Sequence, residues 1–395
     1  MSNVPRLRFK EFSYDFDNEV LADLLQITSK KFDPTKNQEV KKCIELEHLS
    51  QETGCLLGYT DSNEQDSIKN SFEIGQVLFG KLRPYLKKYW QADFGGVCSS
   101  EIWVLNGIQL VNSYLYHLVQ TSKFNQIANV SSGSKMPRSD WQYMSQVPFN
   151  YPSKQEQEKI ATFLTSVDTK IEQLSRKEEL FKEYKKGVMQ KIFAQEIRFK
   201  ADDGGDFPDW EEKRLGDLTK VIVGGTPSTS NESYWKNGSV PWLSSGGIND
   251  GNVTKASKLI TQDGLDNSSA KLMPKGTTLL AMTGATLGRV GYLLIETSGN
   301  QSVAGLVPNH NFYSKFLFYT LFKNKQTILS MAGGAAQAGV NKATIESFKF
   351  KFPIVEEQTK IANFLSSIDS KIEQVGKQLD ESKQFKKALL QQMFV

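Results

Sequence analysis

The chain of 395 residues contains one long segment that occurs twice at a constant separation. Residues 152–174 and 353–375 are identical at 14 of 23 aligned positions, with an offset of 201 residues throughout. Chance does not produce a match of this length and fidelity. The repeat therefore indicates one structural unit that is present twice and is held in two related environments.

Both copies have the pattern of a long helix. Neither contains an internal proline, each closely follows one (Pro152 and Pro353), and acidic residues near each start suit the helix dipole. Apolar residues recur in alternating steps of four and three, which is typical of a coiled-coil seam. These residues are Ile160, Leu164, Val167, Ile171, Leu174, Phe181, Val188 and Ile192 in the first copy, and Ile361, Leu365, Ile368, Ile372, Val375, Leu379, Leu389 and Met393 in the second. We expect the copies to pack on each other, with two unrelated surface helices as the alternative.

The repeat divides the chain into a variable domain (1–153), a helix (154–195), a second variable domain (196–354) and a second helix (355–395). Each variable segment has the length of an ordinary domain. The two share landmarks at the offset of 201, namely Gly75 and Gly276, Gly133 and Gly334, and Phe149 and Phe350. Elsewhere they differ freely, which indicates a duplicated scaffold with two diverged heads.

The variable segments have a mixed α/β pattern. Short β-like runs, bounded by glycine and turn residues, occur at 77–79, 96–98, 102–105, 278–280 and 290–295. Helical stretches lie near 110–123 and 313–331. We therefore predict an α/β fold in which two mixed α/β domains alternate with two long helices.

Catalytic signatures are mostly absent from the sequence. The nearest phosphate loop, residues 334–339, is followed by Val340 where the motif needs lysine, and His48, His117 and His310 are isolated. Three cysteines at unrelated spacings form neither a disulfide framework nor a zinc pattern, and they suit a reducing cytoplasm. No apolar run approaches the ~18–20 residues of a membrane span. We therefore expect a non-catalytic cytoplasmic protein with no metal site and no membrane partner.

The strongest candidate binding patch is the run at residues 81–90, where four cations and three aromatic residues occur without an acidic residue. Lysine and arginine neutralise phosphates, and arginine can also read a guanine edge. The loop at 131–138 ends in two cations. Candidate DNA-binding residues from these segments are Lys81, Arg83, Lys87, Lys88, Tyr89, Ser134, Lys135 and Arg138. A solvated strand and turn with buried aromatics, or a plain loop, is the alternative.

The second variable domain offers weaker signals from short hydrogen-bond donors, aromatic residues and a glycine-rich loop. Its candidate DNA-binding residues are Thr226, Ser228, Trp235, Ser244, Ser245, Arg289, Gln337, Asn341 and Lys342. The two variable domains have formal net charges of −1 and +3. Bulk charge therefore does not indicate a nucleic-acid-binding protein, and a DNA site would have to be a local patch.

Several of these segments together resemble a known family. The stretches GQVLFGKLRPYLKKYW and GVCSSEIWVL within residues 75–105, the segment 224–250 and the two helix starts EQ-x-KIA-x-FL are similar to the DNA specificity (S) subunit of bacterial type I restriction–modification systems. The similarity covers essentially the whole chain. It implies that each variable domain is a target recognition domain that reads one half of a split, asymmetric site in double-stranded DNA. It also implies that the helices form an antiparallel coiled coil, with pseudo-twofold symmetry, that spaces the two halves.

The resemblance further implies two methyltransferase (M) subunits docked on the helices, with restriction (R) subunits joining them. S-adenosylmethionine, ATP and magnesium would then belong to those subunits, with no cofactor in this chain. Because the polar face of the helix is repeated, it offers one surface twice. The partner-binding candidates on it are Lys159, Asp168 and Lys170, with their copies Lys360, Asp369 and Lys371.

Other interpretations stay open. The chain could serve a related restriction system with a different catalytic partner. It could also be a protein-interaction scaffold with a coiled-coil spacer, which would show no sequence-selective retention of DNA. An enzyme with an unrecognised site would show turnover by the isolated chain.

Overall fold

The computed structural model describes residues 4–28, 30–130, 136–309, 312–332 and 339–395. Its contacts divide the chain into two compact units. Unit 1 comprises Met1–Lys177 and Val375–Val395, and unit 2 comprises Glu178–Gln374. Each unit thus holds one variable segment, the start of one long helix and the end of the other.

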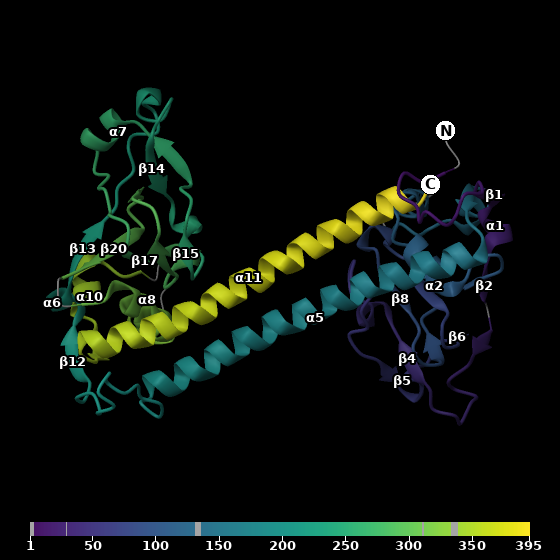
Figure 1. The fold of residues 1–395 in the computed structure, drawn as a ribbon, viewed down its shortest axis with the longest axis horizontal. Helices are drawn as coiled ribbons and strands as arrows, with labels where there is room; N and C mark the ends of the chain where they lie inside the picture. Colours follow the sequence, from purple (N-terminus) through teal and green to yellow (C-terminus); the bar gives the residue numbers. More distant parts are fainter. Residues whose placement is uncertain (1–3, 29, 131–135, 310–311, 333–338) are drawn as a thin grey trace. The chain divides into compact units, whose positions relative to one another are not determined.

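The repeated segments form α5 (Lys154–Phe193) and α11 (Val355–Met393), labelled in Figure 1, which confirms the two long helices predicted from the sequence. At the start of α5, the hydroxyl of Ser153 accepts a hydrogen bond from the backbone N–H of Glu156 at 3.4 Å. At its end, Gln195 adopts a left-handed φ of 60°, and the N–H of Glu196 donates to the carbonyl of Lys191. This arrangement satisfies the last carbonyls and terminates the helix.

Ion pairs between the two helices define their direction. In unit 1, Lys386 of α11 lies 2.5 Å from Asp168 of α5, and in unit 2, Lys185 of α5 lies 2.6 Å from Asp369 of α11. In both pairs, an aspartate in the N-terminal half of one helix meets a lysine in the C-terminal half of the other. The helices are therefore antiparallel, as the resemblance implied.

The variable segment of unit 1 folds into short strands and helices around three sheets. Its elements are β1 (Asp17–Val20), α1 (Leu21–Leu24), β2 (Leu25–Thr28), β3 (Lys31–Phe32), β4 (Lys42–Ile44), η1 (Leu46–His48), β5 (Thr60–Asp61), η2 (Ser62–Glu64), β6 (Lys69–Phe72), β7 (Val77–Gly80), η3 (Pro84–Leu86), β8 (Tyr89–Gln91), β9 (Gly96–Cys98), β10 (Ile102–Gly107), α2 (Asn112–Leu118), α3 (Ser122–Ala128), α4 (Trp141–Met144) and β11 (Pro148–Tyr151). The sheet orders are β2-β10-β7-β8, β3-β6-β9-β4-β5 and β1-β11. These elements confirm the strands expected at 77–79, 96–98 and 102–105.

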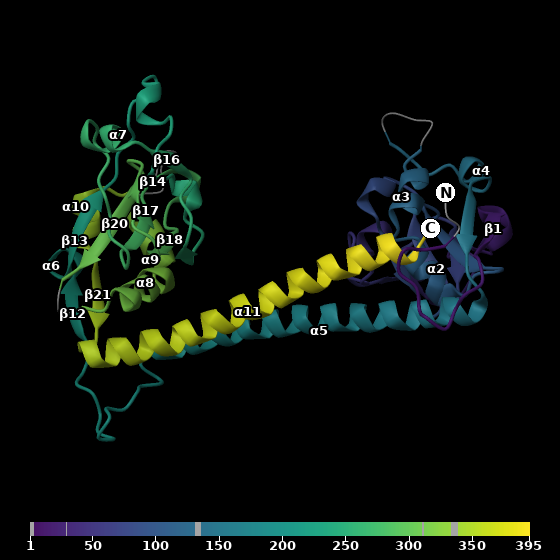
Figure 2. The same ribbon diagram turned by 45° about the horizontal axis from the view of Figure 1, so that its top comes forward.

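Unit 2 repeats this plan with longer helices. Its elements are β12 (Glu211–Arg214), α6 (Leu215–Leu218), β13 (Thr219–Val223), η4 (Glu232–Tyr234), β14 (Val240–Leu243), η5 (Ser245–Gly247), β15 (Asn252–Val253), β16 (Lys258–Ile260), α7 (Gln262–Asp266), β17 (Thr278–Ala281), η6 (Gly284–Thr286), β18 (Val290–Leu293), β19 (Ser298–Gly299), β20 (Val303–Pro308), α8 (Ser314–Lys323), α9 (Lys325–Met331), α10 (Lys342–Ser347) and β21 (Lys349–Phe352). The sheet orders are β13-β20-β17-β18-β15, β16-β14-β19 and β12-β21. Figure 2 shows β21 leading into the start of α11.

The two units share one frame at the sequence offset of 201. Strands β7, β10 and β11 of unit 1 coincide residue for residue with β17, β20 and β21 of unit 2. In unit 1 β7 pairs with β10, and in unit 2 β17 pairs with β20, and both pairs are antiparallel. The structure thus confirms the internal repeat for the variable domains as well as for the helices.

Each unit builds its core from its variable segment and from both helices. In unit 1, Ile160 and Leu164 of α5 and Leu389 of α11 are buried with Tyr114 of α2. In unit 2, the cluster includes Met189 of α5, Leu365 of α11 and Phe316 of α8. The apolar seam of the helices therefore also anchors each variable domain, because the same stripe faces the domain core.

The described part of the chain holds neither a candidate membrane-spanning helix nor a candidate metal cluster. No helix in it is long and apolar enough to cross a membrane. No group of three or more histidine, cysteine, aspartate or glutamate residues in it could hold a metal ion.

Candidate nucleic-acid interface

Tertiary structure joins the two candidate segments of the first variable domain. Leu82, at the turn after β7, forms an isolated antiparallel bridge with Arg138. The backbone N–H of Arg83 donates to the carbonyl of Pro137 at 2.8 Å, and that of Ser139 donates to the carbonyl of Lys81 at 2.9 Å. The basic run after β7 and the segment that ends at Arg138 therefore form one surface. We call it the β7 turn surface (residues 81–88 and 136–138).

Most cations of the β7 turn surface have partners within the chain. Lys87 pairs with Glu52 at 2.7 Å, and Lys88 donates to the carbonyl of Leu46 at 2.6 Å. The guanidinium of Arg138 forms two hydrogen bonds with the carboxylate of Glu101, at 3.0 and 3.2 Å, and this contact raises the pKa of Arg138. Lys87 and Arg138 are thus partly neutralised in the free protein, and among the described residues the ammonium of Lys88 has a hydrogen-bond partner but no counter-charge.

Lys81 and Arg83 differ from their neighbours. Within the described residues, neither side chain has a hydrogen-bond or ion-pair partner. Arg83 is exposed, and Lys81 is partly exposed. Of the described cations predicted in this domain, these two are the ones available to an external anion without breaking an internal contact.

One predicted contact is wrong because the residue lies in the core. Tyr89 is 4% exposed, and its hydroxyl donates to the backbone carbonyl of Glu52 at 2.8 Å. Burial raises the pKa of this hydroxyl well above its ordinary value. The ring occupies an inward position of β8, so Tyr89 supports the turn and does not reach a ligand. Ser134, Lys135 and Gln337, also predicted, lie outside the described residues.

Unit 2 contains the same turn with different side chains. Thr283 forms an antiparallel bridge with Gly339, and the N–H of Val340 donates to the carbonyl of Met282 at 2.9 Å. These contacts correspond, at the offset of 201, to those of Leu82 with Arg138 and of Ser139 with Lys81. The frame of the surface is conserved between the two units, but the cations are not.

The remaining candidates of unit 2 fall into three places. Thr226, Ser228 and Trp235 lie together, since the indole N–H of Trp235 donates to the carbonyl of Ser228 at 3.1 Å. Ser244 is the N-cap of η5 and Ser245 is its first residue, and Arg289 donates to the carbonyl of Ile248, the C-cap of η5, at 3.4 Å. Asn341 caps α10 by accepting from the N–H of Thr344, and Lys342 lies 3.6 Å from Glu346.

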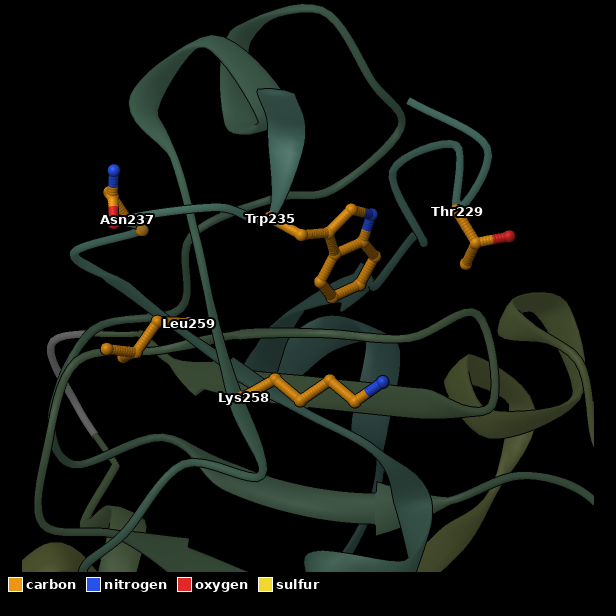
Figure 3. Close-up of a pocket in the computed structure, with 6 residues that line it drawn as sticks. Thr229, Trp235, Asn237, Lys258 and Leu259 are labelled. Carbon is orange, nitrogen blue, oxygen red and sulfur yellow. The ribbon is translucent and has the colours of Figure 1, made fainter. Parts of the chain in front are cut away.

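Trp235 also lines a shallow pocket of about 540 Å³, shown in Figure 3. Lys258 Nζ lies 5.4 Å from the centre of the Trp235 ring, and Thr229 and Leu259 complete the lining with Asn237 and Gly238. Lys258 and Thr229 are not among the candidate residues predicted from the sequence. No local signal marks them, because β16 and the loop before η4 meet only in the folded unit.

The partner-binding candidates on the helices are partly engaged within the chain. Lys159 pairs with Glu11, Lys360 pairs with Asp202 at 2.6 Å, and Asp168 and Asp369 form the interhelical ion pairs. Among the described residues, Lys170 and Lys371 are exposed and have no polar partner. Of the predicted partner-binding residues, Asp168 and Asp369 are thus each paired with a lysine of the other helix.

Two units built on one frame, each with its own loops at the β7 or β17 turn, define a duplicated binding protein. The family model described as "Type I restriction modification DNA specificity domain" matches residues 16–182 and 208–382. The chain therefore belongs to this family and carries two copies of its domain.

Relatives agree with this assignment. The chain is 32% identical to the type I restriction enzyme MjaIX specificity subunit of Methanocaldococcus jannaschii over 193 residues, which span 47% of this chain and 44% of the relative. It is 28% identical to the EcoR124I/EcoR124II specificity subunit of Escherichia coli over 165 residues, 40% of this chain and 41% of the relative. The match to the HindI specificity subunit of Haemophilus influenzae is 22% identical and spans 75% and 81% of the two chains.

Solved structures share the fold. The crystal structure of the type I restriction–modification system S subunit from M. genitalium aligns with a TM-score of 0.66 at 16% identity and covers 99% of both chains. A chain from a study of complex assembly and conformational transition of the type I R-M system aligns with a TM-score of 0.57 at 19% identity, covering 96% of this chain and 98% of the other. The predicted α/β architecture with two long helices is thus confirmed.

Proposed function

We propose that this chain is the subunit of a type I restriction–modification complex that selects the DNA sequence, with each variable domain reading one half of a split target. The observation that carries this proposal is the pair of equivalent turns. One backbone frame holds Lys81, Arg83 and Arg138 in unit 1, whereas Met282, Gly284 and Gly339 occupy the same positions in unit 2. A shared frame with different side chains suits two domains that read different sequences.

Chemistry in this proposal belongs to partner subunits. Two methyltransferase subunits dock on the repeated helix surfaces that carry Lys170 and Lys371, and restriction subunits join that core. S-adenosylmethionine, ATP and magnesium bind those partners, and this chain contributes recognition without a catalytic group. The proposed complex acts on double-stranded DNA in the cytoplasm.

Mapping methylated adenines in DNA from cells that produce this chain tests the proposal. Because the two variable domains differ at most positions, we expect a motif of two unlike halves separated by unspecified base pairs. Deleting the gene for this chain should abolish that motif. A continuous or palindromic motif that depends on this chain would contradict the assignment of one half-site to each domain.

The alternative of a protein-interaction scaffold makes a different prediction. Under that alternative, the chain assembled with a methyltransferase would retain cognate and scrambled duplexes equally. The native mass of the same assembly tests the stoichiometry, since the repeated surface predicts two methyltransferase subunits per chain. A mass that corresponds to one subunit per chain would contradict the paired docking surfaces.

A further inference from the structure

The turn after β7 has an unusual backbone at two cations. Arg83 has φ and ψ of 54° and 58°, and Lys87 has 47° and 55°, so both lie in the left-handed region. In unit 2 the equivalent residues are glycines, Gly284 and Gly288, with φ of 68° and 77°. The same turn conformation therefore occurs twice, with glycine at both positions in one unit and long cations at both in the other.

The backbone of this turn is defined by its hydrogen bonds and not by these side chains. The N–H of Leu86 donates to the carbonyl of Arg83 at 2.9 Å, that of Lys87 to Pro84 at 2.8 Å, and that of Gly80 to Lys88 at 2.9 Å. A residue with a Cβ pays a conformational free-energy cost in the left-handed region, and glycine does not. Arginine and lysine here are thus retained against the local preference of the backbone.

For Lys87 the fold itself supplies a reason for a lysine at a left-handed position. Its ammonium pairs with Glu52, whose backbone N–H donates to the carbonyl of Lys87 at 3.1 Å. For Arg83 the described part of the chain supplies none, since its side chain is exposed and makes no polar contact there. The two described carboxylates that pair with cations of this surface, Glu52 and Glu101, are engaged by Lys87 and Arg138.

We propose that Arg83 contacts the target DNA and is kept at a strained, glycine-type position because this position directs its guanidinium away from the turn. Pro84 fixes the backbone that follows, and the contact of the Arg83 N–H with Pro137 holds the backbone on the other side of the turn. Strain at an exposed residue with no internal partner is typical of a functional position. This inference rests on the proposed function, because it assigns to one residue the DNA contact of the first variable domain.

The equivalent contact is absent from unit 2, where Gly284 leaves open space. No described heavy atom lies within 4 Å of a Cβ built on it. Met282, at the position equivalent to Lys81, is buried. The two domains therefore bind DNA with different chemistry at the same turn, and the first domain carries the cationic version.

The test compares Arg83→Gly with Lys87→Gly in the chain assembled with its methyltransferase. Both variants remove one positive charge and relieve one left-handed residue, so they differ only in whether the lost cation had an internal partner. The probes are a duplex with the methylation motif mapped in the source cell and a scrambled duplex of the same length. Affinity and melting temperature are measured for each variant.

We expect Arg83→Gly to bind the motif duplex about 10-fold more weakly or worse while melting no lower than the parent protein, and Lys87→Gly to lose clearly less affinity than Arg83→Gly, because the ammonium of Lys87 is already paired with Glu52. A loss of affinity for the motif duplex but not for the scrambled duplex identifies a base contact, and an equal loss on both duplexes identifies a phosphate contact; either result supports the proposal.

Three results would overturn it. They are parental affinity in Arg83→Gly, an equal loss of affinity in Lys87→Gly, or a drop in the melting temperature of Arg83→Gly that accompanies its loss of binding. If the parent assembly itself does not prefer the motif duplex, the result contradicts the proposed function and also the inference about Arg83, which rests on that function. The two failures are distinguishable because only the second one appears in the unmodified protein.

Discussion

Lys386 and Asp168 form an ion pair of 2.5 Å between the C-terminal half of α11 and the N-terminal half of α5, and the same pair occurs again in unit 2 as Lys185 and Asp369. The side chains of the first pair are 12% and 25% exposed. Lys386 also donates to Gln120 of the variable domain at 2.6 Å, and Asp369 accepts from the hydroxyl of Tyr319 at 2.6 Å. In each unit, the pair thus links both helices to the variable domain.

Lys386→Ala should destabilise unit 1 by about 2 kcal/mol, between the ~0–1 kcal/mol of exposed pairs and the ~3–5 kcal/mol of buried ones. The reason is that Asp168 would remain largely covered without a counter-charge. Denaturant unfolding measures the change. Exchanging the two residues, with Asp168→Lys and Lys386→Asp together, should recover much of the loss. As a control, Lys182→Ala removes an exposed i,i+4 pair with Glu178 on the same helix and should cost less than about 0.5 kcal/mol.

His117 should make unit 1 sensitive to acid. Its ring is fully buried, its Nε2 lies 3.2 Å from the hydroxyl of Thr165, and its Nδ1 lies 3.9 Å from Asp168. Burial, together with the positive charge of Lys386, lowers the pKa of His117 from 6.5 to about 3. Between the unfolded pKa of 6.5 and the folded pKa of about 3, His117 is protonated in the unfolded chain but not in the folded chain. The free energy of unfolding should therefore fall by about 1.4 kcal/mol for each unit of decreasing pH.

The comparison of the parent with His117→Phe isolates this effect, because Phe318 occupies the equivalent buried position of unit 2. Burial raises the pKa of Asp168, which contributes in the opposite direction on acidification and is present in both proteins. The free energy of unfolding of His117→Phe should therefore depend less steeply on pH below 6.5. Equal slopes in the two proteins would refute the assignment.

Arg198 should be essential to the stability of unit 2. The carboxylate of Glu357, near the start of α11, is fully buried and accepts hydrogen bonds from Arg198 at 2.7 and 3.1 Å and from the indole N–H of Trp210 at 3.2 Å. Arg198→Ala leaves this charge without its counter-ion and should cost about 3–5 kcal/mol in thermal or denaturant unfolding. Lys200→Ala, which removes an exposed pair with Asp206, is the matched control and should change stability by less than about 1 kcal/mol.

Gly284→Ala should destabilise unit 2 by about 1 kcal/mol, since the φ of 68° at this position costs free energy for a residue with a Cβ. Space does not limit the substitution, because the built Cβ meets no described atom within 4 Å. A fall in the thermal unfolding midpoint measures the cost. Gly246→Ala, in the same unit at a glycine without positive φ and with no neighbour closer than 3.7 Å, is the control and should not lower it.

Lys81→Ala should weaken DNA binding by the assembled complex and reduce the slope of log affinity against log salt by about one, as expected for a lost phosphate contact. Lys88→Ala provides the contrast. The ammonium of Lys88 donates to the carbonyl of Leu46. Lys88→Ala should therefore lower the melting temperature and leave the slope of log affinity against log salt almost unchanged. Titrations at several salt concentrations distinguish the two. If only Lys88→Ala reduced the salt slope by about one, Lys88 and not Lys81 would be the residue that contacts phosphate.

Sequence alone determined the plan of this protein. The 4–3 spacing of apolar residues and the repeat at 201 predicted α5 and α11 to within two residues at their ends, and the same offset predicted the correspondence of the two variable domains. Both signals are available without knowledge of contacts. Helical periodicity is local along the chain, and a repeat is a comparison of the chain with itself.

Only tertiary structure decided which residues of the candidate patches are available to DNA. Lys87, Lys88 and Arg138 meet partners that lie 35, 42 and 37 residues away in sequence. Tyr89, which looks from the sequence like part of a basic and aromatic surface, is instead a core residue. Lys258 of β16 lies against the ring of Trp235, which follows η4, and no local sequence pattern connects these two residues.

The physical reason is that charge pairing and burial depend on distances in space between residues that are remote along the chain. The sequence reports the number and order of the cations but not which of them the fold neutralises. It also cannot show that Arg83 and Gly284 share one left-handed turn conformation, because a backbone angle is set by the hydrogen bonds that close the turn. That comparison, which carries the inference about Arg83, exists only once both units are folded.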